Sequence, residues 1–171
     1  MLVGNAWLPQ RPCLDFETRS RRTDGQLAFL SPRFNPRTIY LQLGMGDGTL
    51  ALRAASYVER VYVLDRAELL ARTLAWPCNV RLVAYPGDVL PDDTVELAFA
   101  AGAPEPEAVH AAYRSLAPGA RLFCMPLGHG ESARAVLLEA GFTTRSYALI
   151  AATAVRCPHS LANLVAGIKR R

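Results

Sequence analysis

Three glycines, each separated from the next by one residue, follow a short apolar run: Gly44, Gly46 and Gly48. Glycine lets a backbone turn sharply and approach a ligand closely, and a helix that begins after such a loop offers free N–H groups. A dinucleotide-binding loop has the spacing G-x-G-x-x-G, whereas this loop reads G-x-G-x-G and continues with Thr49. The spacing predicts a ligand-binding loop and argues against a nicotinamide or flavin cofactor.

Two acidic residues follow the next two apolar runs. Asp65 ends the run 61–64, and a carboxylate at that place can accept hydrogen bonds from both hydroxyls of a ribose. Asp before a helical stretch is also a common helix cap, and the two roles can hold together. Asp88, in the sequence Gly-Asp-Val, is predicted either to accept from an exocyclic amine or to be a turn residue after Pro-Gly.

A histidine and a methionine complete the candidate residues. His129 lies in the sequence Gly-His-Gly after the fifth apolar run, as a candidate general base or substrate contact, with a solvated loop histidine as the alternative. Met45 lies in the glycine loop and either lines the ligand pocket or fills space. The cysteines and histidines are scattered without the close pairs that zinc ligands form, so we predict no metal site and no disulfide framework.

The elements that must position these residues alternate along the chain. Short apolar runs are separated by segments of helix length, which is typical of a parallel sheet with helices on both faces. In a doubly wound sheet, ligands bind beyond the carboxyl ends of the strands, where the strand order reverses. We therefore predict a doubly wound α/β fold. The expected strands are 38–43, 61–64, 80–84, 95–101 and 120–125, and the expected helices are 48–58, 67–75, 105–116 and 131–140.

The two ends of the chain depart from this alternation. Residues 1–37 are rich in arginine and proline and predict an irregular N-terminal arm, in which one short helix has room to form. The core domain is expected over 38–157, and its last part, 142–157, predicts two short end strands. Residues 158–171 predict a C-terminal amphipathic helix with a basic tail. Its apolar residues have helical spacing: Leu161, Leu164, Val165 and Ile168.

Composition limits the classes of protein that this chain can belong to. A length of 171 residues with 51% hydrophobic residues suits one domain with a buried core and excludes a wholly disordered chain. The net charge of +4 resides in the two ends, so a nucleic-acid-binding face is not expected. No apolar run has the length of a membrane span, and the N-terminus lacks the pattern of a secretion signal. We expect a cytoplasmic protein.

In their order and spacing, the motifs from about residue 37 to residue 157 resemble those of class I S-adenosylmethionine-dependent methyltransferases. The segment 115–120 is similar to the family's L-x-P-G-G turn, and 138–142 is similar to its L-x-x-A-G-F motif. The resemblance implies a Rossmann-like, mostly parallel sheet, S-adenosylmethionine as cofactor and a methyl acceptor as partner. The cofactor contacts that it implies are Gln42, Gly44, Met45, Gly46, Gly48, Asp65, Arg66, Asp88 and Val89.

Two departures from the family leave the activity open. Gln42 stands where family members have an acid for the cofactor's amine, so Gln42→Glu is expected to tighten binding. The segment 100–104 reads Ala-Ala-Gly-Ala-Pro and offers no catalytic group. The leading hypothesis is a methyltransferase that acts on a small-molecule or macromolecular acceptor. The alternative is a catalytically degenerate binding or scaffold subunit. The apolar stripe 161–168 also favours a homodimer.

Overall fold

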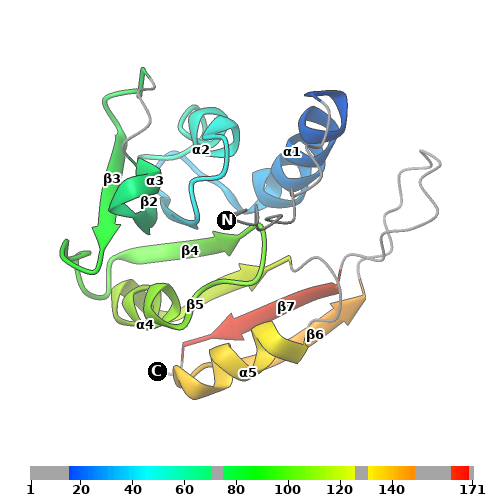
Figure 1. Cartoon of the computed structure of the whole chain (residues 1–171), viewed down its shortest axis with the longest axis vertical. Helices are drawn as coiled ribbons and strands as arrows, with labels where there is room; N and C mark the ends of the chain where they lie inside the picture. Colours follow the sequence, from blue (N-terminus) through cyan, green and yellow to red (C-terminus); the bar gives the residue numbers. More distant parts are fainter. Residues whose placement is uncertain (1–15, 71–74, 126–130, 149–162, 170–171) are drawn as a thin grey trace, which may run out of the picture.

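The computed structural model describes residues 16–70, 75–125, 131–148 and 163–169, and the strands of these residues form one sheet (Figure 1). Among the same residues, no helix is both long and apolar enough to cross a membrane. The strands are β1 (Ile39–Leu43), β2 (Arg60–Arg66), β3 (Val80–Tyr85), β4 (Val95–Ala100), β5 (Leu116–Cys124), β6 (Thr143–Ala148) and β7 (Asn163–Ile168). The helices are α1 (Phe16–Leu30), the 3-10 turn η1 (Ser31–Arg33), α2 (Thr49–Ala54), α3 (Ala67–Leu70), α4 (Pro106–Ser115) and α5 (Glu131–Glu139).

The strand order is β3-β2-β1-β4-β5-β7-β6, and β7 runs antiparallel to both of its neighbours. Strand β1 pairs in parallel with β2 on one side and with β4 on the other. The chain thus builds outward from β1 to β3 and then returns to β4, so the strand order reverses between β1 and β4. A crevice forms beyond the carboxyl ends of two such strands, because their connections leave in opposite directions. The predicted doubly wound α/β fold is confirmed.

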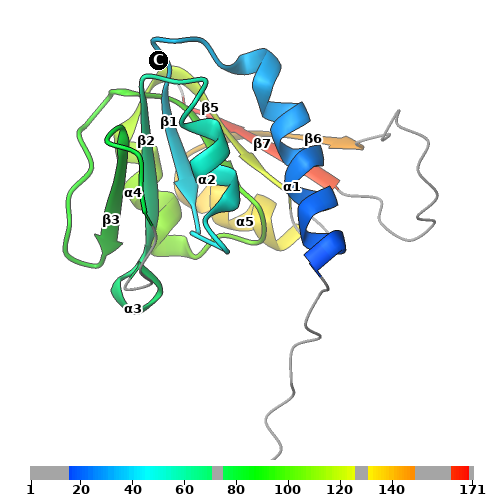
Figure 2. The same cartoon turned by 90° about the horizontal axis from the view of Figure 1, so that it is seen from above.

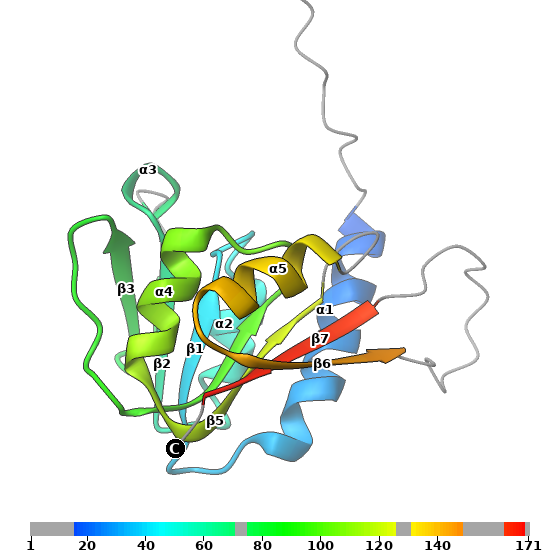
Figure 3. The ribbon, with the colours of Figure 1, turned by 90° about the horizontal axis from the view of Figure 1, so that it is seen from below.

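Helices cover both faces of the sheet. Figure 2 shows α1 and α2 in front of the strands, and Figure 3 shows α4 and α5 in front of the opposite face. Along β4, Leu97 and Phe99 pack in the core beneath α1 and α2, whereas Ala98 and Ala100 pack with α4 and α5. This period of two is the side-chain alternation of a strand, and burial on both faces explains why the strands read as nearly continuous apolar runs.

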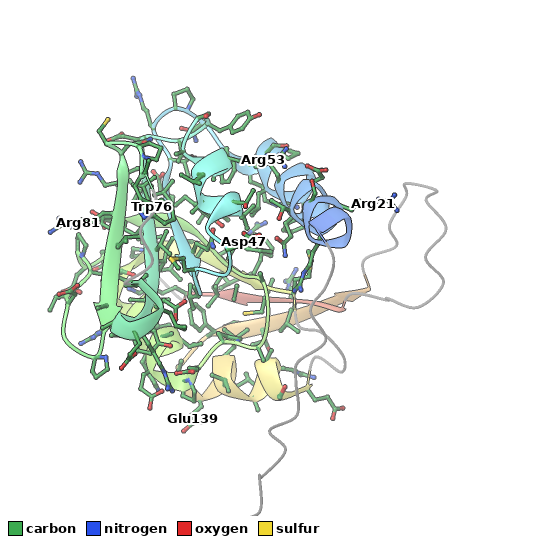
Figure 4. All side chains as sticks on the ribbon, turned by 45° about the horizontal axis from the view of Figure 1, so that its top comes forward. Arg21, Asp47, Arg53, Trp76, Arg81 and Glu139 are labelled. Carbon is green, nitrogen blue, oxygen red and sulfur yellow. The ribbon has the colours of Figure 1, made fainter. Side chains whose placement is uncertain are left out.

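The predicted irregular arm is wrong for residues 16–30, which form the long helix α1. Leu27 and Leu30 are three residues apart, so they lie on one face of the helix, and both are buried in the core shared with α2. Arg53 of α2, labelled in Figure 4, forms an ion pair with Asp24 of α1. The helix therefore packs against the core domain as one of its covering layers.

The predicted C-terminal helix is also wrong, because residues 163–168 form strand β7 between β5 and β6. Val165 is buried in the core on one face of the sheet and Ala166 in the core on the other. A Cβ at Gly167 would lie 2.9 Å from the Phe142 ring, so the packing there needs glycine. A short apolar run fits a helix or a buried strand equally well. Here the run forms a strand because its backbone pairs with two neighbouring strands. Of the end strands predicted over 142–157, β6 is confirmed, and residues 149–157 lie outside the described residues.

Candidate functional site

A cavity of about 380 Å³ lies at the carboxyl ends of β1 and β4, where the strand order reverses. Its walls come from the glycine loop after β1, the loop after β4, the ends of β2 and β3, and helix α1. The volume falls within the range of small-molecule sites, roughly 300–1,000 Å³. The sheet topology therefore places a ligand-sized hollow where the sequence predicts one.

The glycine loop forms one wall of this cavity. Gly44 and Gly46 have φ values of 82° and 61°, which disfavour any residue with a Cβ. A Cβ built on either glycine would meet no atom within 4 Å, so the backbone here stands next to open space. The loop ends at Gly48, the N-cap of α2, which is buried and does not line the cavity.

Asp65, at the end of β2, holds the glycine loop in place. Its Oδ2 accepts a hydrogen bond of 2.6 Å from the Met45 N–H, and its Oδ1 accepts one of 2.8 Å from the Arg66 N–H. The side chain is 6% exposed and lines the cavity. A carboxylate has about four lone-pair sites, so it retains two for a ligand. Asp65 therefore combines a structural bond to the loop with free acceptor capacity toward the cavity.

Gln42 on β1 lines the same cavity and is 3% exposed. Its Nε2 donates to the carbonyl oxygens of Gly44, at 2.9 Å, and Met45, at 3.3 Å. Because both partners are acceptors, the amide must turn its nitrogen to them and its oxygen away. That oxygen, Oε1, is buried and has no hydrogen-bond partner. An unpaired buried acceptor costs free energy until a donor reaches it.

Helix α1 supplies two polar residues that the sequence analysis does not assign to the site. Thr23 and Gln26 are buried and line the cavity, and the Gln26 Nε2 has no hydrogen-bond partner. The position of the helix is fixed by Arg22, whose Nη2 donates to the Ala101 carbonyl at 2.5 Å. The spacing of Leu27 and Leu30 is a local signal for an amphipathic helix, but no local signal places that helix over the cavity.

Arg66, Tyr85 and Glu105 form a charged clamp, of which Tyr85 and Glu105 line another part of the cavity. The Glu105 Oε2 accepts bonds from the Arg66 Nε at 3.0 Å, the Arg66 Nη2 at 2.8 Å and the Tyr85 hydroxyl at 3.0 Å. The bond from Arg66 holds the pKa of Glu105 below its usual value. Burial, assisted by the bond to Glu105, raises the pKa of Tyr85 to about 12. Tyr85 and Glu105 also line a second cavity of about 470 Å³, so the clamp separates the two.

The remaining predicted cofactor contacts lie away from this cavity. Asp88 is exposed, and its Oδ2 accepts a 2.9 Å hydrogen bond from the Ala84 N–H. This bond fits the predicted turn role of Asp88. Val89 is 82% exposed, and neither residue lines the cavity. Arg66 lines the second cavity as part of the clamp. His129 lies outside the described residues.

The loop after β4 borders the cavity with residues 100–105. Its first five residues, Ala-Ala-Gly-Ala-Pro, carry no titratable group, and the sixth, Glu105, belongs to the clamp. Within the part of the chain that the structure describes, no three or more Asp, Glu, His or Cys side chains gather as metal ligands would. The polar side chains of the described cavity are therefore amides, two hydroxyls and carboxylates.

Solved structures of methyltransferases share this architecture. A tRNA methyltransferase from Aquifex aeolicus matches with a TM-score of 0.62 and 18% identity over 87% of this chain and 69% of its own. An S-adenosylmethionine-dependent methyltransferase from Mesorhizobium loti matches with a TM-score of 0.62 and 14% identity, over 86% of this chain and 98% of its own. The S-adenosylmethionine-dependent methyltransferase SibL matches with a TM-score of 0.59 and 22% identity, over 91% and 57%.

The chain has the class I methyltransferase fold. The seven-stranded order 3-2-1-4-5-7-6, with β7 antiparallel, is the architecture of that fold. Identities at or below 22% establish the fold alone. No protein-family model matches the chain, and no curated protein matches it. In the class I methyltransferase fold, the crevice between β1 and β4 is where a ligand is expected, and the cavity described above occupies it.

Proposed function

We propose that the protein is an S-adenosylmethionine-dependent methyltransferase. The observation that carries the proposal is that the Asp65 carboxylate and the Gln42 side chain both line one cavity at the switch point of the sheet. The first offers acceptors to ribose hydroxyls, and the second offers an acceptor to an amine. A nucleoside that carries an amino-acid tail has both kinds of donor.

The residues present fit this cofactor. Asp65 keeps two lone-pair sites after it has bound the Met45 and Arg66 N–H groups. The open space beside Gly44 and Gly46 lets a ligand approach the backbone closely. Met45 and Leu50, both buried, give the cavity apolar lining. The hydrogen-bond donors of the cofactor can therefore reach acceptors in the cavity, and its apolar atoms can pack against the apolar lining.

S-adenosylmethionine supplies a methyl group on a sulfonium, which is a strong electrophile. The contribution of the protein is then mainly to hold the acceptor in line with that group and to exclude water, which supplies a large part of the rate. A hydroxyl or a protonated amine must also lose a proton, and residues 100–104 offer no side chain for this. His129 remains our candidate base or substrate contact.

The second hypothesis is a binding or scaffold subunit with the same fold. The observation in its favour is the bare loop 100–104, which borders the cavity without a group for proton transfer. The Asp65 carboxylate favours the first hypothesis, because it lines the cavity and keeps acceptor capacity after it has bound the Met45 and Arg66 N–H groups.

The acceptor, small or macromolecular, is proposed to lie over the ends of β4 and β5. A homodimer also remains a prediction. The apolar stripe that suggested it contains Val165 and Ala166, and both are buried within the sheet, so the stripe supplies no argument for a dimer. The predictions of no metal, no nucleic-acid partner and a cytoplasmic location likewise stay predictions.

Calorimetric titration with S-adenosylmethionine and S-adenosylhomocysteine tests the proposal. We expect dissociation constants in the micromolar range for the wild-type protein. Asp65→Asn should weaken both by roughly 30-fold, because a neutral amide accepts more weakly and one of its two ends can only donate. Asp92→Asn is the matched control, since Asp92 is exposed in the loop before β4 and does not line the cavity. A folded wild-type protein that binds neither ligand would favour the scaffold hypothesis.

A further inference from the structure

A third cavity, of about 350 Å³, lies near the amino ends of β1 and β4. Thr38, directly before β1, and Leu97, near the start of β4, line it. Gln42 and Ala100, at the other ends of the same two strands, line the cavity described above. Among the described residues, the two cavities have no lining residue in common. We call this separate place the amino-end cavity.

Two arginines from different elements line the amino-end cavity. Arg33 ends η1, and Arg121 lies on β5. The Arg33 guanidinium carbon lies 4.1 Å from the centre of the Phe29 ring and 5.3 Å from that of Phe123, and its Nη1 donates to the Phe29 carbonyl. Because Arg121 is two residues before Phe123 on β5, both side chains point to the face of the sheet on which Arg33 lies.

The two guanidinium groups are close enough to repel each other. Partial burial of Arg33 and, to a smaller degree, the positive charge of Arg121 lower the pKa of Arg33. Among the described residues, neither arginine forms an ion pair with a carboxylate. Glu96 lines the same cavity, and its Oε2 accepts a 2.9 Å hydrogen bond from the Ile39 N–H. Two positive charges therefore face one negative charge here, and a bound anion would relieve the repulsion.

A third arginine extends this positive charge across the sheet. Arg145 on β6 pairs with Ala166 of β7, and Ala166 pairs with Phe123 of β5. Residues directly opposite each other in antiparallel strands point to the same face, so Arg145 lies on the same face as the other two arginines. Arg145 is exposed and forms no ion pair within the described part of the chain. The three arginines and Glu96 together carry two net positive charges.

A phosphate dianion fits this arrangement better than other common anions. A guanidinium group is a planar fork of donors that matches phosphate oxygens, and one phosphate can receive two such forks. A phosphate monoester carries a charge of about −1.5 to −2 at pH 7, whereas a carboxylate carries one charge. Single-stranded nucleic acid is bound by stacking of its bases on open aromatic rings. The rings of Phe29 and Phe123 lie under Arg33, which argues against that ligand.

We infer that the amino-end cavity is a separate ligand site, in which Arg33 and Arg121 bind a phosphate dianion, either the free ion or the monoester of a small molecule. The cavity volume lies within the range of small-molecule sites, roughly 300–1,000 Å³, and leaves room for more than the phosphate. Arg145 adds to the positive potential that attracts the anion. The site does not depend on the proposed function, because the two cavities lie at opposite ends of β1.

Calorimetry on the full chain, in a phosphate-free buffer of constant ionic strength, tests the inference with inorganic phosphate and glycerol 3-phosphate as probes. We expect saturable binding with a dissociation constant of about 1 mM for the better probe. Tighter binding of glycerol 3-phosphate identifies a phosphorylated small molecule as the ligand, and equal or tighter binding of inorganic phosphate identifies the free ion. Succinate, a dicarboxylate, and dimethyl phosphate, which carries one charge, should both bind at least about fivefold more weakly.

The decisive variant is Arg121→Gln. It should weaken the better probe by at least about tenfold, because one guanidinium fork is lost. Without ligand it should melt at or slightly above the temperature of the wild type, because the repulsion of Arg33 is removed. Arg33→Lys keeps the charge but loses the planar fork, and should weaken the probe by about threefold. Arg81→Gln is the matched control, since Arg81 is exposed on β3 and lies outside the cavity (Figure 4). Its effect should be less than about twofold.

Four results would overturn the inference. Equal losses in Arg121→Gln and Arg81→Gln would mean general attraction between charges. Succinate that binds as tightly as the phosphate probes would exclude recognition of phosphate. A single-stranded oligonucleotide that binds more tightly than either probe, and that Arg121→Gln weakens, would assign this face to nucleic acid instead. A folded wild-type protein that binds neither phosphate probe would end the inference and leave the proposed methyltransferase function intact.

Discussion

Gln26 and Gln42, which we call the amide pair, line the same cavity as Tyr85 and Glu105 of the charged clamp, but the two groups treat their polar atoms in opposite ways. Gln26 and Gln42 are nearly fully buried, and each keeps one polar atom without a partner. In the clamp, Arg66 and Tyr85 are partly exposed and both donate to the Glu105 Oε2. The amide pair therefore keeps hydrogen-bonding capacity that no partner meets, whereas the groups of the clamp already satisfy each other.

This difference indicates where binding free energy resides. An unpaired buried polar group keeps its desolvation cost in the ligand-free protein, and a fitting ligand recovers that cost. An ion pair near the surface is screened by water and salt, so its loss or gain changes little. Substitutions at the amide pair should consequently have large effects, and substitutions at the clamp small ones.

Gln42→Glu is expected to have the largest effect. A carboxylate cannot donate to the Gly44 and Met45 carbonyl oxygens, so the change replaces two hydrogen bonds with repulsion in a buried place. We expect the free energy of unfolding to fall by about 3 kcal/mol. Binding of S-adenosylhomocysteine should weaken by roughly tenfold or more, in contrast to the tightening expected from the family resemblance. Thermal unfolding and calorimetry measure the two quantities.

Gln42→Met is the control for this prediction, since it removes the same two hydrogen bonds without adding a charge. It should lie between the wild type and Gln42→Glu in stability. Tighter binding by Gln42→Glu at unchanged stability would show that the amide nitrogen of Gln42 is not needed to hold the glycine loop.

The family resemblance and the structure predict opposite effects of Gln42→Glu, because each considers a different contact of the Gln42 side chain. The position of Gln42 before the glycines points toward the cofactor's amine, and sequence shows only that role. Its bonds to Gly44 and Met45 depend on the positive φ of Gly44, which folds the loop back over β1. The glycine spacing and Asp65 were predictable, because both are local features at strand ends.

Gln26 and β7 were not predictable, because each depends on contacts between distant parts of the chain. Gln26 enters the cavity only because α1 packs beside α2 and is bonded to Ala101, 79 residues away from Arg22. The run 164–168 of β7 carries no polar side chain and fits a helix or a strand, and backbone pairing with β5 and β6 decides its structure. Long-range packing therefore limits what the sequence alone can predict of this site.

Glu105→Gln is expected to have a smaller effect. The pKa of Glu105 lies below its usual value in the folded protein, so its bonds stabilise the fold above about pH 4.3, the usual pKa of a Glu side chain. That stabilisation is lost as pH falls through the lowered value. The wild type should melt at a slightly higher temperature than Glu105→Gln at pH 7, and the two melting temperatures should converge as pH falls through the lowered pKa of Glu105. Affinity for S-adenosylhomocysteine should fall by about threefold at most.

A matched comparison for the clamp is Glu107→Gln, a carboxylate at the exposed start of α4 that borders the second cavity only. Glu107→Gln should leave the affinity for S-adenosylhomocysteine unchanged at pH 7, pH 5 and pH 3. If Glu105→Gln instead weakens binding as strongly as Gln42→Glu, the clamp contacts the ligand directly, and the contrast between the two groups disappears.

Asp88→Asn is expected to have the smallest effect, less than twofold in affinity for S-adenosylhomocysteine. Asp88 is exposed, lies outside the cavity, and uses Oδ2 to accept from the Ala84 N–H, a bond that an amide oxygen can also accept. The family resemblance implies the opposite, because it assigns this residue to the adenine. A loss of tenfold or more, measured by calorimetry at unchanged melting temperature, would mean that the loop after β3 moves over the cavity when ligand binds. The clamp would then have to open, since Tyr85 ends β3 directly before that loop and its hydroxyl is bonded to Glu105.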